Sequence, residues 1–324
     1  RNACLAGRPA YRRAADAAAR LPPMLNLPLS AMHPAAPDDG PSASGSGCRL
    51  CALRKGTWNA RRGFLLAAGA AVAGPALAQV DVGSGSSLRK LVPAETLEEA
   101  ATQQYSQMLA QAKAKQALAP ESNAQLRKLR TISQRLIPFS SQWNSRAAEW
   151  RWEVNLIGSK QINAFCMPGG KIAFYTGILD QLKLTDDEAA MVMGHEMAHA
   201  LREHARARLA KTQATSMGLS LGAQLLGLGD LGNAAANLGT ELLSLRFSRS
   251  DETEADLVGL ELAARAAYDP NASVSLWRKM GEATKNQGGL AFLSTHPSGP
   301  DRIRELEQNV PRVEGLYRAA KQRG

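Results

Sequence analysis

The spacing of hydrophobic and polar residues predicts a mainly helical chain with a small β-sheet. Apolar residues recur at helical spacing over residues 96–116 and again over 122–136, so we expect two amphipathic helices separated near Pro120. From Trp150 to Leu156 apolar and polar residues alternate, which indicates a half-buried strand. The two helices are expected to serve as scaffold for the rest of the domain.

A β-hairpin is predicted directly after that strand. Asn163–Met167 and Lys171–Tyr175 read as strands, and Pro168-Gly169-Gly170 between them is typical of a turn. An exposed edge strand here could pair with an extended peptide by β-augmentation. The pattern leaves open whether the hairpin does so or only covers the core.

The longest helix is expected from Thr185 to Lys211. Thr185 and Glu188 form a capping-box sequence, acidic residues occupy the first turn, and basic residues occupy the last turns. The largely apolar run between them favours a helix, with Gly194 as its weak position. We therefore predict one uninterrupted helix. Together with the strands it gives an α+β fold, mainly α, with a small β-sheet beside this helix.

Residues 215–245 differ in composition, because glycine recurs among Leu and Ala and Asp230 lies in the middle. This pattern is typical of a loosely packed helical hairpin, and Gly and Asp interrupt it too often for a membrane span. Three roles stay open for it: a mobile lid over a cleft, a contact with a lipid surface, or a hairpin of the core.

The N-terminal region is predicted to stand apart from the folded domain. Residues 1–57 are rich in Ala, Pro, Gly, Ser and Arg without lasting periodicity, which indicates a disordered extension or sequence upstream of the true start. Residues 58–78 combine Arg61-Arg62, a short apolar run and Ala76-Leu77-Ala78, the pattern of a secretory signal peptide. Arg-Arg-x-Phe-Leu resembles the twin-arginine export signal.

A membrane anchor is the alternative for this segment. The apolar run from Phe64 to Ala78 has 15 residues, which is shorter than the roughly 20 of a spanning helix. We therefore expect export with cleavage after Ala78, a linker over residues 79–94, and a single domain over residues 95–324.

The formal net charge of +10 does not indicate a nucleic-acid partner. Residues 1–78 hold ten basic and three acidic residues, which leaves 29 basic against 26 acidic residues in the remainder. A nearly balanced body offers no electrostatic case for nucleic-acid binding. Of the four cysteines, Cys166 alone follows the expected cleavage site, and it is predicted to be a small buried hydrophobic residue.

The strongest chemical signal is His195-Glu196-Met197-Ala198-His199. Two histidines four residues apart lie on one face of a helix, so both imidazoles can bind one metal ion, and Glu196 can still reach a water on that ion. A chance match in an ordinary amphipathic helix is the alternative. A catalytic zinc also needs a third protein ligand and an open position for water.

Glu252 is the best candidate for that third ligand. Glu252 and Asp256 are four residues apart and share a helix face, whereas Glu254 points nearly the opposite way. Glu252 can therefore bind the metal while Asp256 accepts the second ring N–H of a ligand histidine. A solvated acidic helix face is the alternative that the spacing leaves open.

Four motifs, in this order, resemble one family of zinc peptidases. They are Asn163-Ala164-Phe165 with Pro168-Gly169-Gly170, His195-Glu196-x-x-His199, Glu252-x-Glu254-Ala255-Asp256, and Thr295-His296-Pro297 with Arg302. They resemble the gluzincin metallopeptidase family that includes the CAAX prenyl protease and HtpX. Within that family, they resemble the soluble periplasmic branch that includes BepA and LoiP. The resemblance implies a zincin-like metalloprotease domain that holds one Zn²⁺ per chain.

The resemblance also implies a role for each matching residue. It implies His195, His199 and Glu252 as metal ligands. Glu196 is then the general base, and Asp256 the hydrogen-bond partner of a ligand histidine.

Substrate contacts follow from the same resemblance. It implies that Asn163, Ala164 and Phe165 form the substrate-binding edge and that Arg302 contacts the substrate. His296 is expected either to act as a fourth metal ligand or to stabilise the oxyanion. His204, five residues after His199, is expected to lie off the ligand face and to be non-catalytic.

The predicted function is a zinc metalloendopeptidase of the bacterial periplasm that cleaves misfolded or unassembled cell-envelope proteins. The alternative is a chaperone-like quality-control or assembly factor whose protease site is closed and rarely active. Unfolded envelope proteins are the expected partners, with a peripheral contact to a membrane or to outer-membrane assembly machinery as a further option. No nucleic-acid partner is expected.

Overall fold

The computed structural model describes residues 80–212, 215, 242, 245–287, 291–297 and 301–323. The chain falls into two units, Arg1–Ala71 and Val72–Gly324, and all described residues belong to the second. The predicted N-terminal extension, the signal peptide and nearly all of the Gly-rich hairpin lie outside the described residues.

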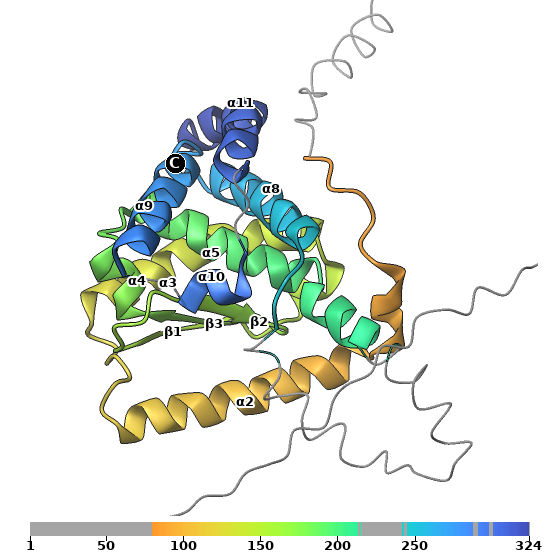
Figure 1. Ribbon diagram of the computed structural model, residues 1–324, viewed down its shortest axis with the longest axis vertical. Helices are drawn as coiled ribbons and strands as arrows, with labels where there is room; N and C mark the ends of the chain where they lie inside the picture. Colours follow the sequence, from red (N-terminus) through yellow and green to blue (C-terminus); the bar gives the residue numbers. More distant parts are fainter. Residues whose placement is uncertain are drawn as a thin grey trace, which may run out of the picture. The chain divides into compact units, whose positions relative to one another are not determined.

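The described elements confirm a mainly helical fold with a small sheet (Figure 1). In chain order they are η1 (Ser87–Leu91), α2 (Ala94–Ala114), α3 (Ala124–Leu136), η2 (Ile137–Gln142), η3 (Ser145–Ala148), β1 (Glu153–Ile157), β2 (Ala164–Met167), β3 (Lys171–Tyr175), α4 (Thr176–Gln181), α5 (Asp186–Leu201), α8 (Arg249–Arg265), α9 (Ala272–Gln287), α10 (Ala291–Thr295) and α11 (Arg302–Lys321).

Helices α2 and α3 confirm the two predicted amphipathic helices. The Asn123 side chain caps α3 by accepting a hydrogen bond from the Leu126 backbone N–H (3.0 Å), and Pro138 follows soon after its end. The apolar face of α3 packs against α5 and β1, whereas α2 packs against β2 and β3. Figure 1 shows α2 and α5 on opposite sides of the sheet, so both of its faces are covered.

The three-stranded sheet has the order β1-β3-β2. Strands β2 and β3 pair antiparallel, with Ala164 opposite Phe174, which confirms the predicted hairpin. Its turn contains Gly169 and Gly170, whose φ angles of 81° and 77° favour glycine. Strand β1 pairs with β3 in parallel, so β2 is left at the edge of this sheet.

The prediction of one uninterrupted helix from Thr185 to Lys211 is wrong. Helix α5 begins with the predicted capping box but ends at Leu201, because Glu203 adopts a left-handed backbone conformation with a φ of 57°. Residues 204–212 are helical again after this turn. Ion pairs with Arg89 (3.3 Å) and Arg206 (2.7 Å) hold the Glu203 carboxylate, and these tertiary contacts stabilise the turn.

Helices α5 and α8 approach each other at two glycines. A Cβ atom on Gly194 would lie 2.8 Å from the Gly259 carbonyl oxygen, and one on Gly259 would lie 2.6 Å from the His195 backbone nitrogen. Glycine at both positions therefore brings the backbone of α8 against the turn of α5 that begins the His-Glu-x-x-His motif.

We expect Gly259→Ala to lower the free energy of unfolding by about 1–3 kcal/mol, because the added methyl group forces apart two packed backbones. Denaturant unfolding measures the effect. Gly281→Ala in α9 is the matched control: nothing lies within 4 Å of its added Cβ, so this variant is expected to be neutral or more stable by up to about 1 kcal/mol. Equal stability of the two variants would contradict the close approach.

Helix α11 begins at Arg302, which belongs to the last of the four motifs. Helix α11 runs on to Lys321 with Pro311 inside it, and it packs against α8 and α9. Short helix α10 is tied to the sheet side by a hydrogen bond from the Phe292 N–H to the Ile162 carbonyl (3.1 Å). These contacts set the positions of His296, directly after α10, and of Arg302, at the start of α11.

Residues 80–93, predicted as most of a linker, lie against the domain. The Val80 N–H donates to the Glu261 carboxylate of α8 (2.5 Å), and Val80 itself is buried. Arg206, in the helical segment that follows the turn at Glu203, donates to the Val92 carbonyl (2.6 Å). Residues 80–93, the N-terminal arm, are therefore packed onto α8 and onto the helical segment that follows α5.

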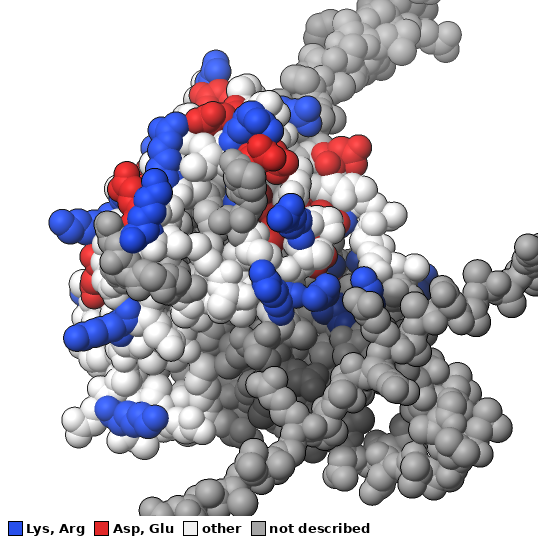
Figure 2. Space-filling model, in the orientation of Figure 1, with Lys and Arg blue, Asp and Glu red and all other residues white. Residues whose placement is uncertain are grey.

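Figure 2 shows basic side chains interspersed with acidic ones over α9 and α11 on the face in view. Among the pairs between these helices is Arg278 with Glu307 (2.8 Å). Within the described part of the chain, every helix is too short or too polar to cross a lipid bilayer.

Candidate active site

Three predicted metal ligands and His296 converge on one point. His195 and His199 come from α5, Glu252 from α8, and His296 directly follows α10, and one ligand atom of each lies within 4.8 Å of the others. The two Nε2 atoms of the α5 histidines are 3.1 Å apart, and the Glu252 carboxylate is 3.4 Å from the His199 Nε2. All four side chains are buried.

Aromatic rings lock the orientations of the imidazoles. Phe247 stacks on His199 with ring centroids 4.0 Å apart, and Phe292 stacks on His296 at 4.4 Å. Phe247 is itself fixed by a hydrogen bond from its N–H to the Thr295 carbonyl (3.0 Å). The donor atoms are therefore held in place by packing, which is what a metal site requires of its ligands.

Asp256 lies where the spacing predicted. Its Oδ1 is 3.0 Å from the Nδ1 of His195, while the Nε2 of the same ring faces the cluster. In a neutral imidazole whose Nε2 binds a metal, Nδ1 carries the hydrogen and donates it to the carboxylate. Burial raises the pKa of Asp256, but the charge of Arg302 and the contacts with His195 together outweigh burial and hold that pKa below its usual value.

Arg302 does not lie in the cleft that faces the motif. Its guanidinium donates to Glu252 Oε2 (2.9 Å) and Asp256 Oδ1 (2.7 Å), and it stacks on the Trp277 ring with 3.4 Å between the Cζ atom and the centroid. The side chain is buried behind the ligand cluster. This position favours a role in which Arg302 holds the Glu252 and Asp256 carboxylates, rather than the predicted role of contacting the substrate.

The carboxylates of the cluster have opposite electrostatic surroundings. Burial raises the pKa of Glu252, but hydrogen bonds from His195, His199 and His296 lower it far more, so Glu252 stays ionised. Burial raises the pKa of Glu196 above its usual value. A ligand carboxylate that stays charged and a neighbouring base that accepts a proton more readily are the pair that metal-assisted hydrolysis needs.

Glu196 has a free oxygen atom aimed at the cluster. Its Oε1 is buried without a hydrogen-bond partner, and the Nε2 of His296 lies 3.6 Å away. A buried carboxylate oxygen is rarely left unpaired unless another group binds there. Two or three imidazoles, one ionised carboxylate and this unpaired oxygen therefore fit a divalent metal ion with a water beside it.

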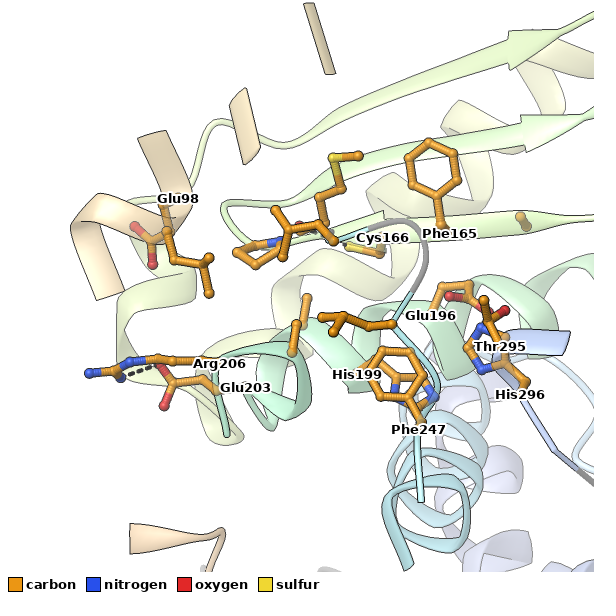
Figure 3. A pocket seen from close by; sticks show the side chains of 18 of the residues that line it. Glu98, Phe165, Cys166, Glu196, His199, Glu203, Arg206, Phe247, Thr295 and His296 are labelled. Atoms are coloured by element: carbon orange, nitrogen blue, oxygen red, sulfur yellow. Dashed lines mark hydrogen bonds and ion pairs between the residues drawn. The ribbon is translucent and has the colours of Figure 1, made fainter. Parts of the chain in front are cut away.

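A cleft opens in front of Glu196 and His199. Figure 3 shows His296 and Thr295 at one end and Glu98, Glu203 and Arg206 at the other. The lining between these ends is mostly apolar and includes Ala94, Leu97, Phe165, Cys166, Met167, Pro168, Ala200, Leu242, Leu245 and Phe247. All three residues of the predicted substrate edge, Asn163, Ala164 and Phe165, line it.

Cys166 also lines this cleft and is buried and free, as predicted. Burial raises the pKa of its thiol well above the usual value, and the nearby charge of Glu196 raises it further. The thiol is therefore protonated and unreactive at neutral pH.

Sequence spacing missed one residue of the site. His204 lies with its Nδ1 2.9 Å from the Nδ1 of His199, on the side of that ring away from the cluster. The left-handed turn at Glu203 carries it there, because an uninterrupted helix would have placed it off the ligand face. No glycine or proline marks this turn in the sequence.

The sequence matches the model of Peptidase family M48 over residues 123–310, so the chain belongs to that family. The matched segment contains every predicted ligand and the sheet beside α5. Membership confirms the expectation of a metallopeptidase family with a zincin-like fold.

Named relatives come from two settings. The chain is 41% identical over 172 residues to the mitochondrial metalloendopeptidase OMA1 of Schizosaccharomyces pombe, which covers 52% of this chain and 50% of that protein. It is 25% identical over 198 residues to the metalloprotease LoiP of Escherichia coli, covering 60% of this chain and 75% of that protein. A Vibrio cholerae protein with the provisional name beta-barrel assembly-enhancing protease is 29% identical over 164 residues, covering 48% of this chain and 34% of that protein.

The chain spans 31–50% of the length of the fungal and plant OMA1 proteins that it matches. Mitochondrial and bacterial proteins both appear among the relatives, so the predicted periplasmic branch stays a prediction.

Proposed function

We propose that this chain is a zinc-dependent metalloendopeptidase that hydrolyses peptide bonds of misfolded or unassembled cell-envelope proteins. One observation carries the proposal: the unpaired Oε1 of Glu196 faces the cluster of His195, His199 and Glu252 at the wall of an apolar cleft. A metal site with a purely structural role does not require a buried base beside its ligands.

When bound, a zinc ion polarises the scissile carbonyl and acidifies water beside it. Glu196 then takes a proton from the attacking water and passes it to the leaving amine, and its raised pKa suits both transfers. His296, with its Nε2 3.6 Å from Glu196, is placed to donate a hydrogen bond to the developing oxyanion. Asp256 and Arg302 keep His195 and Glu252 oriented throughout.

Strand β2 is proposed to hold the substrate. The Tyr175 N–H donates to the Asn163 carbonyl (3.1 Å), and hydrogen-bonded pairs alternate along an antiparallel ladder, so the backbone groups of Ala164 and Cys166 point away from β3. An extended peptide can pair with the Cys166 backbone and the Ala164 carbonyl and lie across the cleft, whereas the Ala164 N–H already donates to Asn163 Oδ1 (3.0 Å). An unfolded chain can present such a peptide, which supports misfolded proteins as the substrate class.

Export to the periplasm is part of the proposal. The basic, apolar and Ala-x-Ala pattern of residues 58–78 supports it, as does the name of the Vibrio relative. Replacing Arg61 and Arg62 by Lys and fractionating cells tests the export route, and undiminished export removes the twin-arginine part.

The direct test is digestion of unfolded casein by the purified protein. We expect cleavage that falls by at least about 100-fold after chelation and returns when one equivalent of zinc is added back. Cleavage that is indifferent to the chelator contradicts the proposal. Folded proteins similar in size to casein should resist cleavage, because they cannot offer an extended strand to β2.

The second candidate is a chaperone-like factor with a closed site. The Nδ1 of His296 lies 3.1 Å from Glu252 Oε1 and 3.4 Å from the Nε2 of His195, so this ring is placed to complete a four-ligand set with no open position. On that model, His296→Ala raises casein cleavage several-fold.

On the oxyanion model, the same His296→Ala substitution lowers kcat by about 10²–10³-fold. The KM for casein should change little, because His296 would contact the substrate mainly in the transition state. Initial rates over a range of casein concentrations therefore separate the two models.

A further inference from the structure

The two histidines of α5 are supported in different ways. His195 reaches a carboxylate directly, since its Nδ1 is 3.0 Å from Asp256. His199 instead meets another imidazole, since its Nδ1 is 2.9 Å from the Nδ1 of His204. His204 is only 4% exposed, and its ring stands nearly perpendicular to that of His199 with centroids 4.9 Å apart.

A carboxylate lies beyond His204. The Nε2 of His204 is 3.4 Å from Glu254 Oε2, and the same oxygen accepts a hydrogen bond from the Nε of Arg202 (2.9 Å). Arg202 also donates to the Gly83 carbonyl of the N-terminal arm (2.8 Å). His199, His204, Glu254 and Arg202 therefore form a continuous chain of contacts that ends at the arm.

The contacts assign the hydrogens along this chain. The Nε2 of His199 faces the ligand cluster, so a neutral His199 that binds metal must carry its hydrogen on Nδ1 and donate it. The Nδ1 of His204 is then the acceptor, and the hydrogen of His204 is on Nε2, facing Glu254. Each donor in this series of contacts meets one acceptor, and the series ends on the Glu254 carboxylate, whose charge Arg202 balances.

We propose that His204 is a positioning residue that acts with Glu254 to hold His199 in its metal-binding tautomer and orientation. The inference rests on the proposed function only in that the cluster binds a divalent metal. A relay of this kind raises the basicity of the ligand imidazole, and loss of such a partner typically weakens metal binding 10–100-fold.

Placement on different elements favours this role over simple core packing. Glu254 lies on α8 between the ligand Glu252 and Asp256 but turns to the other side of that helix, where the 202–204 turn brings Arg202 and His204 to meet it. A histidine that only fills space needs no acceptor on one ring nitrogen and no donor partner on the other. Here both nitrogens are used, and one of them touches a predicted ligand.

The test is zinc affinity of the folded full chain, measured by competition with a chromophoric chelator. His204→Phe fills the same space without an acceptor and is expected to bind zinc about 10–100-fold more weakly. His204→Gln can accept from His199 and donate to Glu254, and it is expected to regain most of the affinity. Glu254→Leu, changed on the opposite helix, is expected to weaken binding several-fold.

Glu261→Gln is the matched control. Glu261 is a buried carboxylate on the same helix that bonds to Val80 and Arg265, away from the ligands, so its loss is expected to lower stability and leave zinc affinity unchanged. Circular dichroism and the d–d spectrum of Co²⁺ bound in place of zinc report whether the fold and the ligand geometry persist.

Wild-type zinc affinity in folded His204→Phe overturns the proposal, as does equal weakening in the Phe and Gln variants. If His204→Phe does not fold, the affinity of Glu254→Leu decides in the same way. A wild-type protein that binds zinc but cleaves no casein overturns the peptidase function and leaves the relay standing.

Discussion

Glu196→Gln is expected to lower peptide cleavage by about 10²–10⁴-fold while zinc stays bound. Glutamine has the same shape and an oxygen that can still bind water, but it cannot take a proton from that water or give one to the leaving amine. The proposed metal ligands His195, His199 and Glu252 are untouched, so the zinc content of the purified variant should remain at one ion per chain. Casein digestion and metal analysis on the same sample measure both quantities.

Two further variants make this result specific. His195→Ala removes a ligand and is expected to lose zinc and activity together. Glu261→Gln changes another buried acid of α8 and is expected to keep both at temperatures where it is folded. Wild-type-like proteolysis by Glu196→Gln would contradict the mechanism. Among the described residues, Glu196 is the one carboxylate with a buried oxygen atom that lacks a hydrogen-bond partner, so no other carboxylate there could replace it as the base.

The grouping of the candidate ligands was predictable because it depends on local geometry. Spacing of four residues places His195 beside His199 on α5, and the same spacing places Glu252 beside Asp256 on α8. The structure brings these four residues together as the pattern predicted, with Asp256 against the free nitrogen of His195. The hairpin was predictable for a similar reason, since two glycines with positive φ mark its turn.

The end of α5 was not predictable from local pattern. Leu201, Arg202, Glu203 and His204 are all acceptable in a helix, and a left-handed glutamate costs about 1–2 kcal/mol. The turn is compensated by contacts with residues more than 100 positions earlier, at Arg89 and Val92. Those contacts depend on the folded arm, so the position of His204 beside His199 could not be inferred from helical spacing.

Arg302 shows the same limit of local patterns from the other end of the chain. An arginine at the start of an amphipathic helix is usually solvated, yet here it is 6% exposed and lies between the carboxylates of Glu252 and Asp256. Its place follows from the packing of α11 on α8, which brings together residues 46 and 50 positions apart. A pairing across that separation leaves no periodic signal.

Arg302→Leu is expected to lower the free energy of unfolding of the metal-free protein by about 3–5 kcal/mol. The substitution leaves two buried carboxylates without their cation, and breaking a buried ion pair from one side costs about that much. It also removes the guanidinium from the Trp277 ring. Arg302→Lys should recover only part of the loss, because one ammonium group cannot fork between Glu252 and Asp256 as the guanidinium does.

The deficit of Arg302→Leu should depend on pH in a defined direction. In the wild type, Arg302 holds the pKa of Asp256 below its usual value, so this ion pair stabilises the fold at neutral pH and the contribution is lost as pH falls through the folded-state pKa. In the variant, burial still raises that pKa and the contact with His195 is the remaining cause that lowers it, so the variant keeps less of this pH-dependent stabilisation. The difference between the two proteins should therefore be largest near neutral pH and shrink on acidification.

Arg304→Leu, two residues along the same helix, is the matched control for this experiment. Arg304 pairs with Asp301, but both side chains are more than half exposed, so its removal should change stability by less than about 1 kcal/mol. Denaturant titrations of the three arginine variants at several pH values measure the comparison. An Arg302→Leu protein as stable as Arg304→Leu would mean that Arg302 does not balance the carboxylates behind the metal ligands, and the assignment of Arg302 to holding Glu252 would fail with it.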